Sequence, residues 1–259
     1  QDDLPKTDYF AYTIEDGDGD RDTAILKIDV TPSNLVAPDD NDAKVHEDAL
    51  DTTQDAADLA AGSVTGSVPG SGAETDGSNQ LNAQNGTPPY TYELVGSDTG
   101  TYGKIQINPN GSYKYTLTDP VTGATADNDK NTEEDLENFT YKVTDALGNT
   151  ATGTIRVDIV DDVAIANDDN DSVVEGGQAT GNVYTGVDVA VNPDSNSSPL
   201  DGTADVPGAD GASIIGVRAA TGGSDKTDVV GGLGAVIDGA YGTLTLLANG
   251  DYRYDANPN

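Results

Sequence analysis

Carboxylates recur at alternate positions around glycines in one short segment, Asp16-Gly17-Asp18-Gly19-Asp20-Arg21-Asp22. A tight glycine-containing turn with an oxygen donor at every second residue can direct several ligands onto one hard cation, as calcium-binding loops do. The segment lacks the later glutamate and the following helix of an EF-hand, so it is not that motif. The pattern predicts Ca²⁺ at the four aspartates; the alternative is a solvated hairpin turn.

Acidic residues also gather where two regions of the chain join. Three aspartates with an asparagine among them occur twice, and two more precede the second copy. So many carboxylates in a short joint repel one another unless a cation neutralises them. A charged, soluble linker is the alternative. We therefore expect further Ca²⁺ ligands among Asp39, Asp40, Asp42, Asp161, Asp162, Asp168, Asp169 and Asp171.

Two more acidic segments give weaker signals. Asp145 corresponds to Asp16 in the repeat described below and is included among the expected metal ligands, although its turn, residues 145–149, has lost most of the other carboxylates. The segment Asp127–Asp135 has oxygen donors at alternate positions, and an acidic surface loop explains it equally well.

The residue types give little support to catalysis. His46 is the only histidine and there is no cysteine, so thiol chemistry is excluded and nothing indicates a Ser-His-Asp arrangement. Acids are plentiful enough for a paired-carboxylate glycosidase. However, they lie at expected turns, and the chain has no tryptophan. We expect that the protein is not an enzyme.

The elements that must hold these acids are strands, and they repeat. Residues 10–16 reappear as residues 139–145, and the two phenylalanines, Phe10 and Phe139, set an offset of 129 residues. Apolar residues alternate with polar ones in pairs of runs joined by turns, at 10–14 with 26–30, 105–107 with 113–117, 139–143 with 155–159 and 244–246 with 252–254. Period-two alternation with intervening Asn-Gly turns is typical of β-hairpins. A repeat of this length indicates tandem modules.

The repeat predicts an all-β chain of antiparallel, immunoglobulin-like β-sandwich modules. We expect residues 1–35 to be the last hairpin of one module, 36–161 a complete module, and 162–259 a partial module without its last hairpin. Two polar segments, 70–88 and 192–211, are predicted to be long surface loops.

Composition limits the partners. The chain has 12 Lys and Arg against 46 Asp and Glu, a net charge of −34, which disfavours nucleic acids and direct contact with anionic membranes and favours cations. Without cysteine no disulfide can staple the modules, so bound metal is the expected clamp. Because there is no methionine, we expect the sequence to be an internal piece of a longer protein.

The strand and turn pattern resembles a known family. Tyr102-Gly103, the Asn110-Gly111 turn with its flanking alternation, and the run from Phe139 to Asp145 followed by Ala166 to Asp169 are similar to the VCBS-type, cadherin-like repeats of giant RTX adhesins exported by type I secretion. The resemblance implies extracellular β-sandwich modules on a bacterial cell surface, joined through Ca²⁺, that space an adhesive tip in cell adhesion and biofilm formation.

Two roles follow as hypotheses. The first is an extender made of neighbouring repeats, folded and stiffened by Ca²⁺. The second is a lectin-like or protein-binding module that uses loops 70–88 and 192–211. The two chain ends are expected to be complementary parts of one module, so strand complementation between molecules is also predicted, because a lone hairpin and an open sheet edge are both marginal in water.

Overall fold

The computed structural model describes residues 6–50, 75–122, 131–188 and 202–258. These residues form strands with a single 3-10 turn, η1 (Glu47–Ala49), so the all-β fold of several antiparallel sheets is confirmed. None of the described helical segments is long and apolar enough to cross a membrane. The parts of segments 70–88, 127–135 and 192–211 that fall at 70–74, 127–130 and 192–201 lie outside the described residues.

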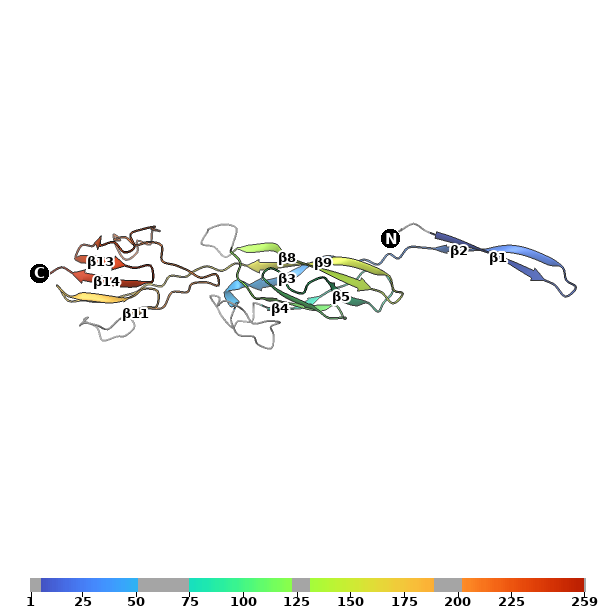
Figure 1. Ribbon diagram of the computed structural model, residues 1–259, viewed down its shortest axis with the longest axis horizontal. Helices are drawn as coiled ribbons and strands as arrows, with labels where there is room; N and C mark the ends of the chain where they lie inside the picture. The colour runs from blue at the N-terminus through green and yellow to red at the C-terminus, as the bar shows by residue number, and fades with distance from the viewer. Residues whose placement is uncertain (1–5, 51–74, 123–130, 189–201, 259) are drawn as a thin grey trace.

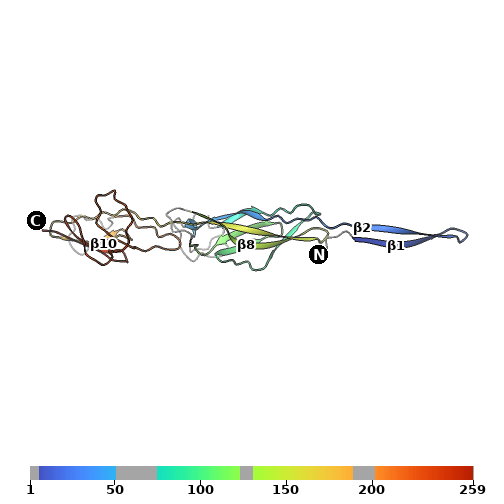
Figure 2. The same cartoon turned by 90° about the horizontal axis from the view of Figure 1, so that it is seen from above.

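The strands fall into three groups that follow one another along the long axis (Figures 1 and 2). The first group is the two-stranded sheet of β1 (Lys6–Glu15) and β2 (Arg21–Val30). The second has two sheets, in strand orders β3-β9-β8-β5 and β4-β7-β6. Its strands are β3 (Asp40–His46), β4 (Thr75–Gln80), β5 (Thr91–Val95), β6 (Gly103–Ile107), β7 (Ser112–Leu117), β8 (Thr132–Thr144) and β9 (Thr150–Val160).

The third group is one sheet in the order β11-β10-β14-β13-β12. Its strands are β10 (Gln178–Asn182), β11 (Val187–Asp188), β12 (Ile237–Asp238), β13 (Gly242–Leu246) and β14 (Asp251–Ala256). The grouping is compatible with the predicted boundaries at residues 35 and 161, which remain a prediction. All four hairpins expected from the sequence are present.

The two sheets of the middle group enclose its core. Alternate residues of β8 and β9 face inward, so Phe139, Tyr141 and Ile155 are buried against Tyr115 and Ile105 of the opposite sheet. The rings of Tyr115 and Phe139 lie 5.9 Å apart. The expected pairing of apolar residues across this hairpin needs one correction. Only Phe139 and Ile155 lie directly opposite each other, because the turn sets a register that places the other apolar residues opposite small or acidic ones.

A glycine allows the close packing of the β6–β7 hairpin. A Cβ atom at Gly103 would lie 2.4 Å from the Tyr115 hydroxyl, and one at Gly242 would lie 2.6 Å from the Tyr254 hydroxyl in β13–β14. The glycine of the Tyr-Gly pair that the two hairpins share therefore has a packing reason. Backbone bonds recur as well, since Gly100 N–H donates to Gly103 O and Gly239 N–H to Gly242 O, both at 2.8 Å.

The first and last strands of the middle group pair in parallel, an exception to the antiparallel expectation. β3 lies beside β9, with Val45 opposite Ile159 and the segment before Ala43 shifted in register. Both strands therefore run the same way along the sandwich. The chain enters the group at one end and leaves it at the other, about 36 Å away for the 11 residues of β9.

Two sequence interpretations need correction here. Asp40 and Asp42, expected in a linker, lie in β3, because the backbone of this segment pairs with β9. Residues 75–80, expected in a loop, form β4 at the edge of the second sheet and pair with β7. The sequence of β4 is polar throughout, so backbone hydrogen bonds rather than an apolar face hold it, and alternation gave no signal.

Candidate metal centre

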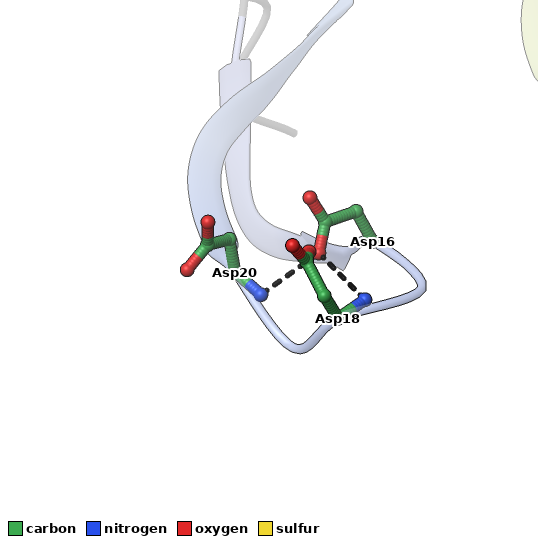
Figure 3. A group of neighbouring side chains, drawn as sticks. All are labelled: Asp16, Asp18 and Asp20. Carbon is green, nitrogen blue, oxygen red and sulfur yellow. Dashed lines mark hydrogen bonds between the residues drawn. The ribbon is translucent and has the colours of Figure 1, made fainter.

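The turn between β1 and β2 is organised by one carboxylate. Asp16 Oδ1 accepts backbone N–H groups from Gly19 at 3.0 Å and Asp20 at 2.9 Å, and a longer one from Asp18 at 3.3 Å. Gly19 has a φ of +100°, a conformation that glycine adopts without strain. The spacing of aspartates and glycines therefore produces a compact turn in which the Asp16 carboxylate is directed back onto the turn and toward Asp18 (Figure 3).

Three carboxylates meet at this turn. Asp16, Asp18 and Asp20 each offer an oxygen atom within 4.8 Å of the others, and within the described ranges this is the group of three or more acids that is close enough to hold a metal ion. All three side chains are exposed. Hydrogen bonding, first to the Asp18 side chain and then to the backbone of Asp20, lowers the pKa of Asp16. The site is thus anionic and open to solvent, and its all-oxygen donor set fits Ca²⁺.

Asp22, the fourth predicted ligand of this segment, lies outside the cluster. It belongs to β2, opposite Ile14, and its Oδ1 accepts the N–H of Thr23 at 2.9 Å. Its direction is therefore set by the strand ladder, not by the turn.

The turn between β8 and β9 has the same backbone hydrogen bonds as the Asp16 turn but only one of its acids. Asp145 Oδ1 accepts the N–H of Leu147 at 3.0 Å and of Asn149 at 2.9 Å, matching the bonds of Asp16. Its Oδ2 accepts the N–H of Thr87 at 3.1 Å. Hydrogen bonds, the largest from the Asn149 side chain, lower the pKa of Asp145. Here the shared aspartate fixes a turn, and an asparagine amide occupies the position of a neighbouring carboxylate.

The acids at the first joint bind groups of the middle sandwich. Asp39 pairs with Arg156 at 3.0 Å, and its other oxygen accepts the Thr154 N–H at 2.9 Å. Asp40 accepts the hydroxyl of Tyr113 at 2.6 Å. Asp42 is exposed in β3. The structure therefore gives Asp39 and Asp40 a part in anchoring β3, and their expected role as metal ligands stays a prediction.

The corresponding acids near the third group are held differently. Asp168 pairs with Lys226 at 2.8 Å, and Asp171 accepts the Tyr252 hydroxyl at 2.5 Å, as Asp40 does from Tyr113. Asp169 lies between them with its Oδ1 buried and without a hydrogen-bond partner. Burial, followed by repulsion from Asp205 and Asp168, raises the pKa of Asp169. A cation would satisfy this oxygen.

A third acidic group, which sequence reasoning found only in part, lies where β9 ends. Glu47 is fully buried, and its carboxyl accepts the N–H groups of Val121 and Asp162. Burial, together with a hydrogen bond to Asp161, raises the pKa of Glu47 to about 8. Asp162 accepts the N–H of Ala209 at 3.0 Å, which links the end of β9 to residues near the third sheet.

The repeat could not reveal Glu47, because residue 176, one repeat later, is glycine. Asp161 and Asp162, by contrast, were expected from their place after the strand. Burial raises the pKa of Asp161 as well. The predicted joint acids are therefore distributed over several small groups rather than gathered in one. His46 ends β3 next to Glu47, and the expectation that the chain is not an enzyme stays untested.

Comparison with known proteins gives one informative relative. The chain is 31% identical over 159 residues to the calcium-binding lectin RapA2 of Rhizobium johnstonii, a match that covers 60% of this chain and 57% of that protein. The chain thus spans little more than half the length of this relative. No protein-family model matches the chain.

Proposed function

We propose that the chain is a run of spacer modules in a bacterial cell-surface adhesin of the VCBS, cadherin-like type, folded and stiffened by Ca²⁺. A spacer passes the chain from one end of each module to the other, so that modules extend in line. A sandwich whose first and last strands lie antiparallel would return the chain to the side where it entered.

The parallel pairing of β3 with β9 is the observation that carries this proposal. Val45 and Ile159 lie side by side in strands that run in one direction, so the connections before β3 and after β9 leave from opposite ends. The successive positions of the three strand groups in Figure 1 agree with that direction. Adhesion at a distance from a cell surface needs this kind of serial geometry.

Calcium is assigned to the joints and to the acidic turn. The turn of the middle group lies against the preceding linker, since a Cβ at Gly86 would meet both Leu35 and Asp145 within 3.2 Å. The Asp16 turn is its counterpart one repeat earlier, so in a longer array its three carboxylates would face a joint. The unpartnered oxygen of Asp169 and the calcium-binding relative support the same assignment.

The net charge of −34 suggests how such a chain would be exported and folded. Without Ca²⁺ the acids repel one another and favour extended states, which suit type I secretion; outside the cell Ca²⁺ binds the folded state and stabilises it. A calorimetric Ca²⁺ titration combined with small-angle scattering tests this. We expect saturable binding and a longer, stiffer particle with Ca²⁺. Identical melting and scattering profiles in Ca²⁺ and in excess chelator would refute the proposal.

A second candidate is a lectin-like module, because the relative is described as a lectin. In that case the polar segments 70–88 and 192–211 would contact a glycan or a protein. A glycan array read with and without Ca²⁺ separates the two functions. Glycan binding that disappears when either segment is deleted would favour the lectin, whereas intact adhesion after both deletions would favour the spacer.

A further inference from the structure

The hairpin β1–β2 presents an apolar face that no other part of the described residues covers. Phe10, Tyr12 and Leu26 lie on one face of the hairpin, and Ile14, Ile28 and Val30 share it. Phe10 is 52% exposed, whereas Phe139, one repeat later, is 4% exposed. The same comparison holds for Leu26 at 50% and Ile155 at 0%. A contiguous apolar face of this size marks an interaction surface.

The middle group shows what such a hairpin covers. There β8–β9 fills the centre of a sheet, with β5 paired to β8 and β3 paired to β9. Its inner face closes the core over the β6–β7 hairpin, where Tyr115 donates a hydrogen bond to the buried Glu137 at 3.4 Å. One repeat earlier, Asp8 stands at the position of Glu137 on the exposed face of β1.

The third group has the flanks of this arrangement and no central hairpin among its described residues. Residues 169–175 correspond to β3 but form no strand, and Val174 is 56% exposed where Val45 is 0% exposed. Residues 230–234 correspond to β5 by the offset of 139 between Gly111 and Gly250, and Val230 is exposed. The core face of β13–β14 is open in part: Leu246 is buried, but Leu244, Tyr252 and Tyr254 are half-buried, whereas their counterparts Ile105, Tyr113 and Tyr115 are buried.

We propose that the β1–β2 hairpin of one molecule inserts between segments 169–175 and 230–234 of a second copy and completes its β-sandwich. The register follows from the middle group. Asp158 lies opposite Lys44 there, so Asp29 of one copy would lie opposite Val173 of the other. Tyr254 would gain Asp8 as its partner, as Tyr115 has Glu137. The bond between Gly231 and Ile215 has to give way to the inserted strand.

The β1–β2 hairpin of this chain is held away from the third group of the same chain. The linker after β2 is held to the middle group, where Val36 and Gln84 exchange backbone bonds of 2.9 and 3.0 Å. The middle sandwich therefore separates the hairpin from the third group of its own chain (Figure 1). Because the donor and acceptor surfaces differ, the contact is head-to-tail, and copies would add in series rather than form a two-fold dimer.

Two adjacent positions provide a matched test by sedimentation at rising protein concentration. Leu26→Asp places a charge on the apolar face, whereas Ile25→Asp places the same charge on the opposite face, at a side chain that is 60% exposed. We expect wild type and Ile25→Asp to form a concentration-dependent series of oligomers and Leu26→Asp to stay monomeric. A monomeric wild type at all concentrations, or equal loss in both variants, would overturn the proposal.

Disulfide trapping tests the register, because the chain has no cysteine of its own. When Asp29→Cys and Val173→Cys proteins are mixed under mild oxidation, we expect a heterodimer as the main cross-linked product. Asp98→Cys, in a surface loop of the middle group, serves as the control partner for Asp29→Cys. Equal cross-linking to both partners would reject the proposed register. Chelator in parallel samples separates this contact from the calcium proposal, since the apolar insertion does not require the Asp16 cluster.

Discussion

The aspartates at two equivalent positions of the repeat, Asp16 and Asp145, share one role and differ in a second. Asp16 and Asp145 both bind the backbone of their turn, and this shared role explains why the residue type recurs. The metal-binding potential of the first turn comes from its neighbours, Asp18 and Asp20, which correspond to Leu147 and Asn149 in the second turn. Recurrence of an acid across repeats is therefore evidence for a turn before it is evidence for a metal.

Neutralising Asp18 and Asp20 should separate metal binding from the turn-forming role of Asp16. In the Asp18→Asn, Asp20→Asn double variant, two of the three clustered carboxylates lose their charge while Asp16 continues to bind the turn. We expect calorimetry to show that Ca²⁺ affinity at this site falls at least about tenfold, which is about 1.4 kcal/mol. Asp22→Asn removes one charge from the same segment outside the cluster; it is the control and should leave the affinity unchanged. Equal losses in both variants would indicate general electrostatic attraction.

Glu47 should make folding depend on pH in an unusual direction. Its pKa is raised to about 8 from an ordinary 4.5, so the folded protein holds this proton more tightly than the unfolded chain does. The free energy of unfolding therefore decreases as pH rises from about 4.5 through about 8, by about 1.4 kcal/mol for each pKa unit of difference.

We expect Glu47→Gln to flatten that decrease, because a glutamine amide can retain the Val121 and Asp161 contacts without a charge. Urea unfolding in chelator at pH 5, 7 and 9 measures the effect. Asp48→Asn, the next acid in η1, is the control and should keep the wild-type slope. An unaltered pH profile in Glu47→Gln would mean that another group titrates.

At the scale of elements, the two equivalent hairpins should contribute differently to folding stability: β8–β9 is packed in a core, and β1–β2 is exposed. Ile155 is fully buried in β9, and removing its side chain beyond Cβ creates a cavity that typically costs about 2–5 kcal/mol. Its counterpart Leu26 is half exposed in β2. In dilute solution, Ile155→Ala should lower the urea midpoint of the middle group clearly, and Leu26→Ala should leave it within error. Similar shifts would show that β1–β2 is also packed in the monomer.

The hairpins were predictable from sequence because each has one apolar face and a turn that contains Gly with Asn or Asp, as in Tyr113 and Tyr115 beside the Asn110-Gly111 turn. β4 was not, since its side chains are polar and its place is fixed by pairing with β7. The turn at Asp16 was predicted to bind metal through four aspartates, and three of them lie together in the structure. That they bind a metal stays a prediction. The buried Glu47 was missed because the residue one repeat later is Gly176, so the repeat did not mark its position.

At the scale of the whole molecule, the direction in which the chain runs through the middle group connects the proposed spacer function with the proposed insertion between molecules. β3 and β9 run in parallel, so the middle group passes the chain from one of its ends to the other. In the proposed insertion, the exposed face of β1–β2 and the partly open face of β13–β14 would be the donor and acceptor halves of that same arrangement. Covalent continuation in a longer chain and insertion between molecules would therefore produce the same axis, and one sandwich geometry accounts for both.

The net charge of −34 gives the last prediction, because it allows a bound cation to be distinguished from screening. An ionic strength of about 0.1 M shortens the range of charge interactions to about 10 Å, whatever cation supplies it. A site of converging carboxylates instead prefers Ca²⁺, since Mg²⁺ demands a tighter octahedral shell and gives up its water reluctantly. We therefore expect chelator to lower the melting temperature and a low concentration of Ca²⁺ to restore it. Mg²⁺ or NaCl at equal ionic strength should restore only part of the lost melting temperature. If NaCl alone recovered the full melting temperature, the acids would act through repulsion, and the joints would need no ion.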